Sequence, residues 1–219
     1  MTEQRGPGRV GLMRMMVITS RDAKRGRGHE DVARAALDAG CRAVQLRDKR
    51  MSDRDFAEVA LRIRGACRER GALFLVNDRV DVACAVHSDG VHLGVDDIDV
   101  AIARKLLPPG SLVGFSPESV SGAGEAVRSG ADYLGVGPVF RSPSKADAGE
   151  PIGVDGLSAY CREGLAPVIG VGGINASNAA GVLEAGAAGA AVGSAVARAN
   201  DMEAAAREVL ESLDPAAVT

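Results

Sequence analysis

Side chains that could grip a phosphate gather in the second half of the chain. Residues 130–153 read GADYLGVGPVFRSPSKADAGEPIG, a short apolar run followed by a polar loop. In that loop the hydroxyls of Ser142 and Ser144 and the ammonium of Lys145 can converge on phosphate oxygens. An exposed surface loop without a ligand would contain the same residue types. The loop is therefore a candidate anion site. Whether it binds an anion has to be judged together with the residues that follow the other apolar runs.

The segment VQLRDK ends an earlier apolar run with amide and basic side chains. Gln45 and Arg47 alternate with apolar residues, so they lie on one face of the predicted strand. Arg47 and Lys49 place a guanidinium and an ammonium close together, which suits a diphosphate. Outward salt bridges to Asp48 or Asp53 are the alternative interpretation.

Carboxylates follow the next two apolar runs. Asp78 comes directly after LFLVN, and Asp97 follows the run that contains His92. Two carboxylates from neighbouring loops, with a diphosphate between them, form the kind of site that Mg²⁺ prefers. Helix capping explains the same residues equally well, because Asp78 precedes a predicted helix and Asp96 or Asp97 could begin the next one. The sequence leaves both interpretations open.

Small residues follow three other runs. Gly173 comes after PVIGV, Gly193 and Ser194 come after AAV, and Ser116 comes after LVGF. Glycines at such positions let a phosphate approach backbone N–H groups, and the N-terminus of a following helix favours an anion. Ser116 could contact that ligand or simply cap the next helix.

The sequence shows no evident residue set for nucleophilic catalysis. His92 lies inside a short apolar run, which favours a hydrogen-bonded core histidine over a catalytic base. No Ser-His-Asp or Cys-His combination stands out. No lysine falls inside a predicted strand, which weakens a Schiff-base mechanism. The residues thus favour binding of phosphates and of a cation.

Eight short apolar runs carry these residues and alternate with helical patterns. Such alternation with short connections builds a parallel sheet, because each parallel crossover needs a helix. The predicted strands are 13–19, 43–47, 73–77, 90–93, 112–115, 133–136, 167–171 and 190–192. The predicted helices are 29–39, 52–70, 80–86, 99–106, 119–129, 155–161, 175–185 and 201–213.

Eight strand–helix units predict an α/β fold, a single-domain (β/α)8 TIM barrel. We expect the barrel to span residues 13–214, after a disordered tail over residues 1–12. A doubly wound open sheet is the alternative, but no GxGxxG motif follows the first predicted strand. In barrels of this kind the active site lies at the carboxyl ends of the strands, which is where the polar residues above fall.

Composition narrows the possible partners. The chain has 219 residues, a net charge of −3, 3% aromatic residues and no tryptophan, which argues against a nucleic-acid partner. No apolar run reaches the roughly 18 residues of a membrane span, and no signal peptide is evident. Scattered cysteines predict buried free thiols and a cytoplasmic protein: Cys41, Cys67, Cys84 and Cys161. The oligomeric state, including a homo-oligomer, stays open.

Together these segments resemble the thiamine phosphate synthase family. The resemblance rests on four motifs in that family's order and spacing, which cover most of residues 40–200. They are VQLRDK (44–49), NDRVDVACAVHSDGVHLG (77–94) with Asp97, GADYLGVGPVFRSPSKADAG (130–149) and PVIGVGGINASNAAGVLEAGAAGAAVGSAV (167–196). Four ordered motifs are highly specific as a set.

The resemblance implies a transferase that uses Mg²⁺. It would join 4-amino-2-methyl-5-pyrimidinylmethyl diphosphate to a thiazole phosphate, forming thiamine phosphate and releasing pyrophosphate. In the family the pyrimidine leaves as a carbocation, helped by its own amino group, and the thiazole nitrogen then attacks. Negative charge develops on the leaving group, where cations can stabilise it. No strong protein base is needed for this reaction.

The resemblance also implies roles for the residues that match the motifs. Asp78 and Asp97 would bind Mg²⁺. The pyrimidine diphosphate would contact Gln45, Arg47, Lys49, Asn77, Ser116 and Lys145. The thiazole side would be lined by Ser142, Pro143 and Ser144, and the thiazole phosphate would bind at Gly173, Gly193 and Ser194. The residues expected to take part in catalysis are Arg47, Lys49, Ser116 and Lys145.

Departures from the family pattern concern substrate fit more than the reaction. Val95 stands where the family usually has Gln, Pro117 follows Ser116, and Gly193 replaces an apolar residue. A thiazole tautomerase of the same fold is the nearest alternative, but it is expected to use a histidine after the fifth predicted strand, and none occurs there. A phosphate-sugar isomerase would need a pair of bases at the strand ends. A non-catalytic paralogue would bind thiamine phosphate without turnover.

Overall fold

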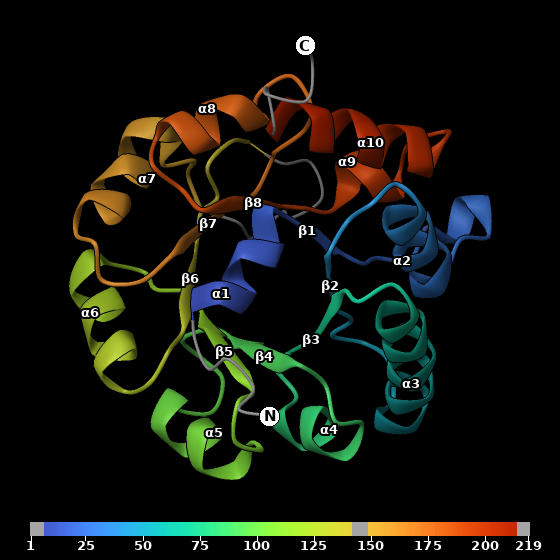
Figure 1. Cartoon of the computed structure of the whole chain (residues 1–219), viewed down its shortest axis with the longest axis horizontal. Helices are drawn as coiled ribbons and strands as arrows, with labels where there is room; N and C mark the ends of the chain where they lie inside the picture. Colours follow the sequence, from blue (N-terminus) through green and yellow to red (C-terminus); the bar gives the residue numbers. More distant parts are fainter. Residues whose placement is uncertain (1–6, 142–148, 214–219) are drawn as a thin grey trace.

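Eight parallel strands form one closed barrel (Figure 1). The structure is a computed structural model that describes residues 7–141 and 149–213. Each strand pairs with the next along the chain, and β8 pairs with β1, which confirms the predicted (β/α)8 barrel and excludes the open sheet. The strands are β1 (Met15–Ile18), β2 (Ala43–Leu46), β3 (Leu73–Asn77), β4 (Gly90–Leu93), β5 (Leu112–Phe115), β6 (Tyr133–Val136), β7 (Val168–Val171) and β8 (Gly189–Val192).

Helices surround the barrel on its outside (Figure 1). They alternate with the strands as predicted, and no bound shifts by more than four residues. The main helices are α2 (His29–Asp38), α3 (Asp53–Glu69), α4 (Val80–Ala85), α5 (Val100–Leu106), α6 (Val120–Arg128), α7 (Gly153–Arg162), α8 (Ala179–Glu184) and α10 (Met202–Leu213). Four short helices add to the prediction: α1 (Pro7–Val10), η1 (Gly11–Arg14), η2 (Ala23–Arg25) and α9 (Ser194–Ala197).

Helix α3 shows why these segments are helical. The Ser52 hydroxyl accepts a hydrogen bond from the Asp55 N–H at 3.2 Å, so the predicted N-cap is confirmed. Its buried side chains recur at helical spacing and form one apolar stripe against the barrel. They are Phe56, Ala60, Ile63 and Cys67.

Helix α8 begins later than the sequence pattern predicts. Residues 175–178 form a turn in which side-chain amides bind the backbone. The Asn175 N–H donates to Asn178 Oδ1 at 2.9 Å, and the Ser177 N–H donates to Asn175 Oδ1 at 2.9 Å. These bonds compete with the helical pattern, so the helix begins at Ala179.

The N-terminal segment closes one end of the barrel. Helix α1 (Pro7–Val10) lies across the middle of the ring of strands in Figure 1 and leads into η1 (Gly11–Arg14). Val10 and Met13 are buried in one cluster with interior residues of the barrel. Because this end is filled, a ligand must enter from the carboxyl ends of the strands.

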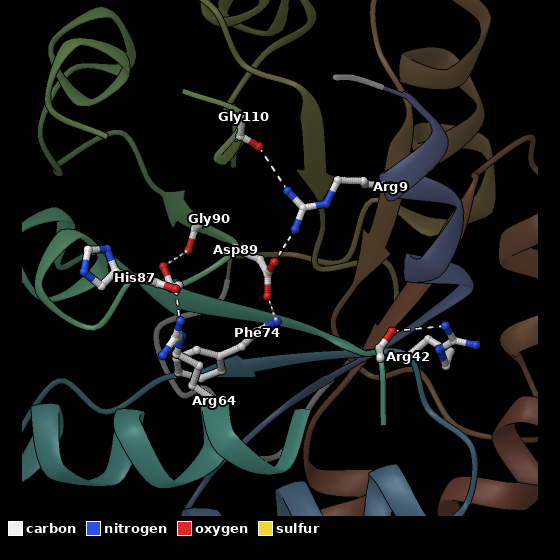
Figure 2. Close-up of polar contacts among 10 residues, drawn as sticks. Arg9, Arg42, Arg64, Phe74, His87, Asp89, Gly90 and Gly110 are labelled. Atoms are coloured by element: carbon white, nitrogen blue, oxygen red, sulfur yellow. Dashed lines mark hydrogen bonds and ion pairs between the residues drawn. The ribbon is translucent and has the colours of Figure 1, made fainter. Parts of the chain in front are cut away.

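Polar contacts fasten this segment to the amino ends of the strands (Figure 2). The Arg9 guanidinium donates to the Gly110 carbonyl at 3.0 Å and pairs with Asp89. Asp89 in turn accepts the Phe74 N–H at 2.9 Å. The predicted disordered tail over 1–12 is therefore wrong for residues 7–12, because their apolar and basic side chains have partners at the base of the barrel. Residues 1–6 lie outside the described part.

Alternate residues of each strand face the barrel interior. Met16, Leu75 and Tyr133 belong to an interior cluster, whereas Val44 and Phe74 pack in another cluster with the outer helices. This period of two is what a closed barrel requires. It also places Gln45, between outward-facing neighbours, inside the barrel.

The four cysteines are free thiols, as predicted. Cys41 and Cys67 are buried, and burial raises the pKa of Cys41 to about 11. Cys84 and Cys161 are only half-buried, so the prediction of burial is wrong for these two. Among the described residues, no helix has the length and apolar character needed to cross a membrane.

Candidate active site

Polar residues of β2 and β3 converge at the carboxyl end of the barrel. Gln45 is 1% exposed and pairs in register with Leu75 of β3. Arg47 follows two positions later, half-buried, and thus continues the same face. Asn77 ends β3 and is also buried. The predicted shared face of Gln45 and Arg47 agrees with this geometry.

The carboxylates of Asp78 and Asp97 meet. Asp97 lies close enough to act on the Asp78 carboxyl, and the Asp97 Oδ2 atom accepts the Gly94 N–H at 2.7 Å. Burial, followed by the hydrogen bond and the negative charge of Asp97, raises the pKa of Asp78 to about 6. Two carboxylates forced together in this way form a natural place for a cation.

The alternative that these aspartates cap helices is wrong. Helix α4 has Arg79 at its N-cap, without a side-chain capping bond. Helix α5 is capped by Asp99, whose Oδ1 accepts the N–H groups of Ala101 and Ile102 at 2.8 and 3.2 Å. Neither Asp78 nor Asp97 therefore caps α4 or α5.

Two cations lie beside the carboxylate pair. Lys49 Nζ is 3.7 Å from Asp78 Oδ2, and the charges of Lys49 and Arg47 both act to lower the pKa of Asp78 against the stronger effects above. The alternative pairing partners of these cations are engaged elsewhere: Asp48 pairs with Arg21, and Asp53 pairs with Arg79. The structure thus brings two carboxyl groups and two basic side chains, which carry positive charge, together at the carboxyl end of the barrel.

A buried histidine that sequence reasoning overlooked holds this segment in place. His29, at the start of α2, contacts Thr19 Oγ1 through Nδ1 at 2.8 Å and Asp48 Oδ2 through Nε2 at 3.1 Å. Asp48 Oδ1 also accepts the N–H groups of Arg50 and Met51 at 2.8 and 3.0 Å. The turn that carries Arg47 and Lys49 is therefore tied to the end of β1.

The charges in this network are settled by burial and hydrogen bonding. Burial lowers the pKa of His29, against the opposing effect of Asp48. Burial opposes ionisation of Asp48, but hydrogen bonds from Arg50 and His29 and the charge of Arg21 leave its pKa below the usual value. At neutral pH the carboxylate therefore stays ionised.

Ser116 lies after β5 and does not cap the next helix. Its Oγ atom is 2.8 Å from His92 Nε2, whereas Ser119 accepts the Gly122 N–H and caps α6. His92 is 8% exposed and hydrogen-bonded, which confirms the predicted core histidine. Ser116 therefore follows β5 without a capping role, and its contact with a ligand stays a prediction.

Small residues end β7 and β8, which are neighbouring strands. Gly172 and Gly173 have φ angles of 98° and 67°, in the left-handed region that favours glycine. The Asn178 amide donates to the Gly173 carbonyl at 3.0 Å. Gly193 precedes α9, and Ser194 begins it. The three predicted phosphate-binding residues thus follow adjacent strands.

Four predicted residues cannot be placed in this site. Ser142, Pro143, Ser144 and Lys145 lie outside the described residues. Within the described ranges, no group of three or more His, Cys, Asp or Glu side chains could hold a metal ion. Any cation at Asp78 and Asp97 would therefore take further ligands from a substrate or from water.

The fold and the site define a class of protein. It is a (β/α)8 barrel with paired carboxylates, two cations and glycine-rich strand ends at one mouth, an arrangement suited to phosphorylated substrates and a divalent cation. Residues 15–196 match the family model described as thiamine monophosphate synthase. The chain belongs to the thiamine monophosphate synthase family.

Similarity to known thiamine-phosphate synthases supports this family assignment. A thiamine-phosphate synthase of Chloroflexus aurantiacus is 50% identical over 196 residues, which cover 90% of each chain. One from Archaeoglobus fulgidus is 48% identical over 190 residues, which cover 87% of this chain and 89% of the relative. The solved structure of a thiamine phosphate pyrophosphorylase from Pyrococcus furiosus matches with a TM-score of 0.85 at 38% identity. The match covers 94% of this chain and 97% of the solved chain. The resemblance seen in the sequence motifs is therefore confirmed.

Proposed function

We propose that the chain catalyses the synthesis of thiamine phosphate from the pyrimidinylmethyl diphosphate and the thiazole phosphate, with release of pyrophosphate. The observation that carries this proposal is the contact between Asp78 and Asp97 beside Lys49 and Arg47. Opposite charges so placed suit a diphosphate together with its divalent cation. The family and its relatives, named as synthases, support a transferase.

Mg²⁺ fits the residues at this mouth. The pKa of Asp78 is raised by burial and by Asp97, so the two carboxylates repel each other when both are ionised. A divalent cation would relieve that repulsion, and two carboxylates with substrate oxygens are a usual ligand set for Mg²⁺. When bound, the ion would neutralise charge on the leaving pyrophosphate.

Basic and amide residues would contact different parts of the first substrate. Arg47 and Lys49 would hold the diphosphate, because both lie beside the carboxylates that would hold its metal. Gln45 and Asn77 are buried amides within the barrel and would contact the pyrimidine end. Ser116 would contact this substrate and its leaving group from the carboxyl end of β5.

The second substrate is assigned to the neighbouring part of the mouth. Gly173, Gly193 and Ser194 follow β7 and β8 and would offer backbone and hydroxyl donors to the thiazole phosphate. The proposed thiazole-side residues Ser142, Pro143 and Ser144, and the catalytic Lys145, are assigned by their motif alone.

The proposed reaction needs orientation and charge stabilisation from the protein. The C–O bond to the diphosphate breaks, and its electron pair leaves with pyrophosphate. Arg47, Lys49 and Lys145 would stabilise the negative charge that develops there. The thiazole nitrogen then supplies an electron pair to the pyrimidine methylene carbon and forms the new C–N bond. No proton has to leave the thiazole, so the missing base is no obstacle.

A turnover assay tests the proposal directly. Purified protein would be mixed with both substrates and Mg²⁺, and thiamine phosphate would be measured after oxidation to fluorescent thiochrome. We expect product, loss of product with a chelator, and recovery when Mg²⁺ is restored. Binding of thiazole phosphate without turnover would instead support the tautomerase or the non-catalytic paralogue. A cytoplasmic location and a homo-oligomer stay predictions.

A further inference from the structure

Three neighbouring strands place His92, Gly114 and Tyr133 at the same level of the barrel. His92 of β4 pairs in register with Gly114 of β5, and Gly114 pairs with Tyr133 of β6. Residues paired in this way point to the same face of a sheet. Because the middle position has no side chain, the outer two side chains meet across it, with ring centroids 5.5 Å apart.

Glycines make the space for this contact. A Cβ atom on Gly114 would lie 2.5 Å from His92 Nδ1 and closer still to the Tyr133 ring. A Cβ atom on Gly135 would lie 2.7 Å from His92 Cε1 and 3.2 Å from Ser116 Oγ. Any other residue at these two positions would displace the histidine or the tyrosine, so the pair is accommodated by two separate strands.

Hydrogen bonds run from the tyrosine through the histidine to Ser116. The Tyr133 hydroxyl is 3.0 Å from His92 Nδ1, and His92 Nε2 is 2.8 Å from Ser116 Oγ. Tyr133 is 0% exposed, whereas Ser116 is half-buried at the mouth. The chain of contacts thus connects the closed interior with the residue that faces the proposed substrate.

Burial decides the direction of these hydrogen bonds. A buried phenol has to donate its proton, because an unpaired buried O–H is costly, and burial raises the pKa of Tyr133 so that it keeps this proton. With His92 Nδ1 as acceptor, the neutral ring carries its proton on Nε2. Nε2 then donates to Ser116 Oγ, and the Ser116 hydrogen must point away from His92.

We propose that Tyr133 and His92 are positioning residues that turn the hydroxyl proton of Ser116 toward the anionic leaving group. The proposal rests on the proposed function only in its last step, the contact between Ser116 and the pyrophosphate. A hydroxyl held in this direction can donate as negative charge develops, without reorientation during the reaction. With the opposite direction of bonds, Ser116 would offer lone pairs to an anion and repel it.

The ring nitrogens of His92 report the direction in the protein without substrate. The chain has three histidines, so ¹⁵N spectra of the rings can be assigned with variants of the exposed His87 and of His29. We expect the ring proton of His92 on Nε2 and a lone pair on Nδ1. A proton on Nδ1, or a doubly protonated ring, would overturn the proposal whether or not the protein turns over substrate.

A double-mutant cycle tests the consequence for catalysis. We expect Tyr133→Phe to lower kcat/KM about tenfold, the usual effect of losing one hydrogen bond near developing charge. In the Ser116→Ala background, Tyr133→Phe should cause no further loss, because the effect passes through the serine. An equal loss in both backgrounds would mean a structural role and would refute the proposal.

The second tyrosine of the chain provides a matched control. Tyr160→Phe, on α7 and half-buried, should leave kcat/KM unchanged. Thermal melts of each variant would show whether the barrel is intact. If His92 carries its proton on Nε2 but the protein shows no turnover, the proposed function is refuted. The direction of the hydrogen bonds from Tyr133 to Ser116 would still be supported.

Discussion

Asp78 illustrates how a proposed metal ligand can lower the stability of the metal-free protein. Its carboxylate is crowded by Asp97 and partly withdrawn from water, so ionisation is unfavourable. Its backbone has a φ of 65°, a left-handed conformation that Asn adopts readily. Asp78→Asn therefore removes the charge with little change in the backbone, which makes it a sharper probe than alanine.

We expect Asp78→Asn to lower kcat/KM by roughly a hundredfold or more, because the proposed cation loses one of two carboxylate ligands. The thiochrome assay at increasing Mg²⁺ concentration would measure this. Asp81→Asn is the matched control, since Asp81 is exposed in the first turn of α4. Unchanged dependence on Mg²⁺ in Asp78→Asn would refute the metal assignment.

The same substitution should stabilise the metal-free protein at neutral pH. The pKa of Asp78 is 3.8 when unperturbed and about 6 in the folded chain, so between these values the folded state holds a proton that the unfolded state has lost. This contribution to the unfolding free energy falls as pH rises from about 4 to about 6. Asp78→Asn should match the wild type near pH 4 and gain about 1–2 kcal/mol above pH 6, allowing for solvent screening.

Denaturant unfolding in the presence of a chelator, at several pH values, would measure that gain. The matched control is again Asp81→Asn. A constant difference between variant and wild type across the pH range would show that the carboxylate pair is not the cause.

At the scale of the elements, the loop after β2 depends on contacts with β1 and α2. Asp48 binds His29, Arg21 and two backbone N–H groups of its own turn. Asn in this position would keep an oxygen for the backbone but lose the charge that His29 and Arg21 face. The turn that presents Arg47 and Lys49 would then be less well fixed.

We expect Asp48→Asn to raise KM for the pyrimidine diphosphate by roughly tenfold and to change KM for the thiazole phosphate much less. Steady-state kinetics with each substrate varied in turn would measure both constants. Asp38→Asn, which breaks a surface pair with Arg70, should change neither. An equal rise in both constants would contradict the assignment of the two substrates to different strand ends.

At the scale of the whole molecule, the two ends of the barrel have different tasks. One end is filled by α1 and η1, with Met13 fully buried, and the other carries the candidate active site. In barrels of this type, the end opposite the active site serves stability. The N-terminal segment should therefore affect folding and not catalysis.

Met13→Ala should lower the unfolding free energy by about 2–5 kcal/mol, the usual effect of a large cavity in a core, while kcat/KM stays unchanged at a temperature where the variant is folded. Urea denaturation and the thiochrome assay would measure the two quantities. Leu12→Ala, at a half-buried neighbour, should cost less. A large loss of kcat/KM in the folded variant would mean that the two ends are coupled.

The sequence alone determined the order of strands and helices and the ends at which polar residues gather. Four strands have the predicted bounds, because the apolar period of two and the flanking turn residues are local properties. The motifs likewise specified which residues to suspect, including Gln45, Asp78 and Asp97. Misplaced boundaries, such as the start of α8, arose where side chains bind the backbone nearby.

Only the tertiary structure decided which of these residues meet. The sequence left helix capping open for Asp78, whereas the barrel excludes that role and places Asp78 beside Asp97, nineteen positions away. The contact of His92 with Tyr133, and the tie between His29 and Asp48, had no signal in the sequence. Such contacts depend on the register of neighbouring strands and on closure of the barrel, and both are set by packing of the whole chain and not by local pattern.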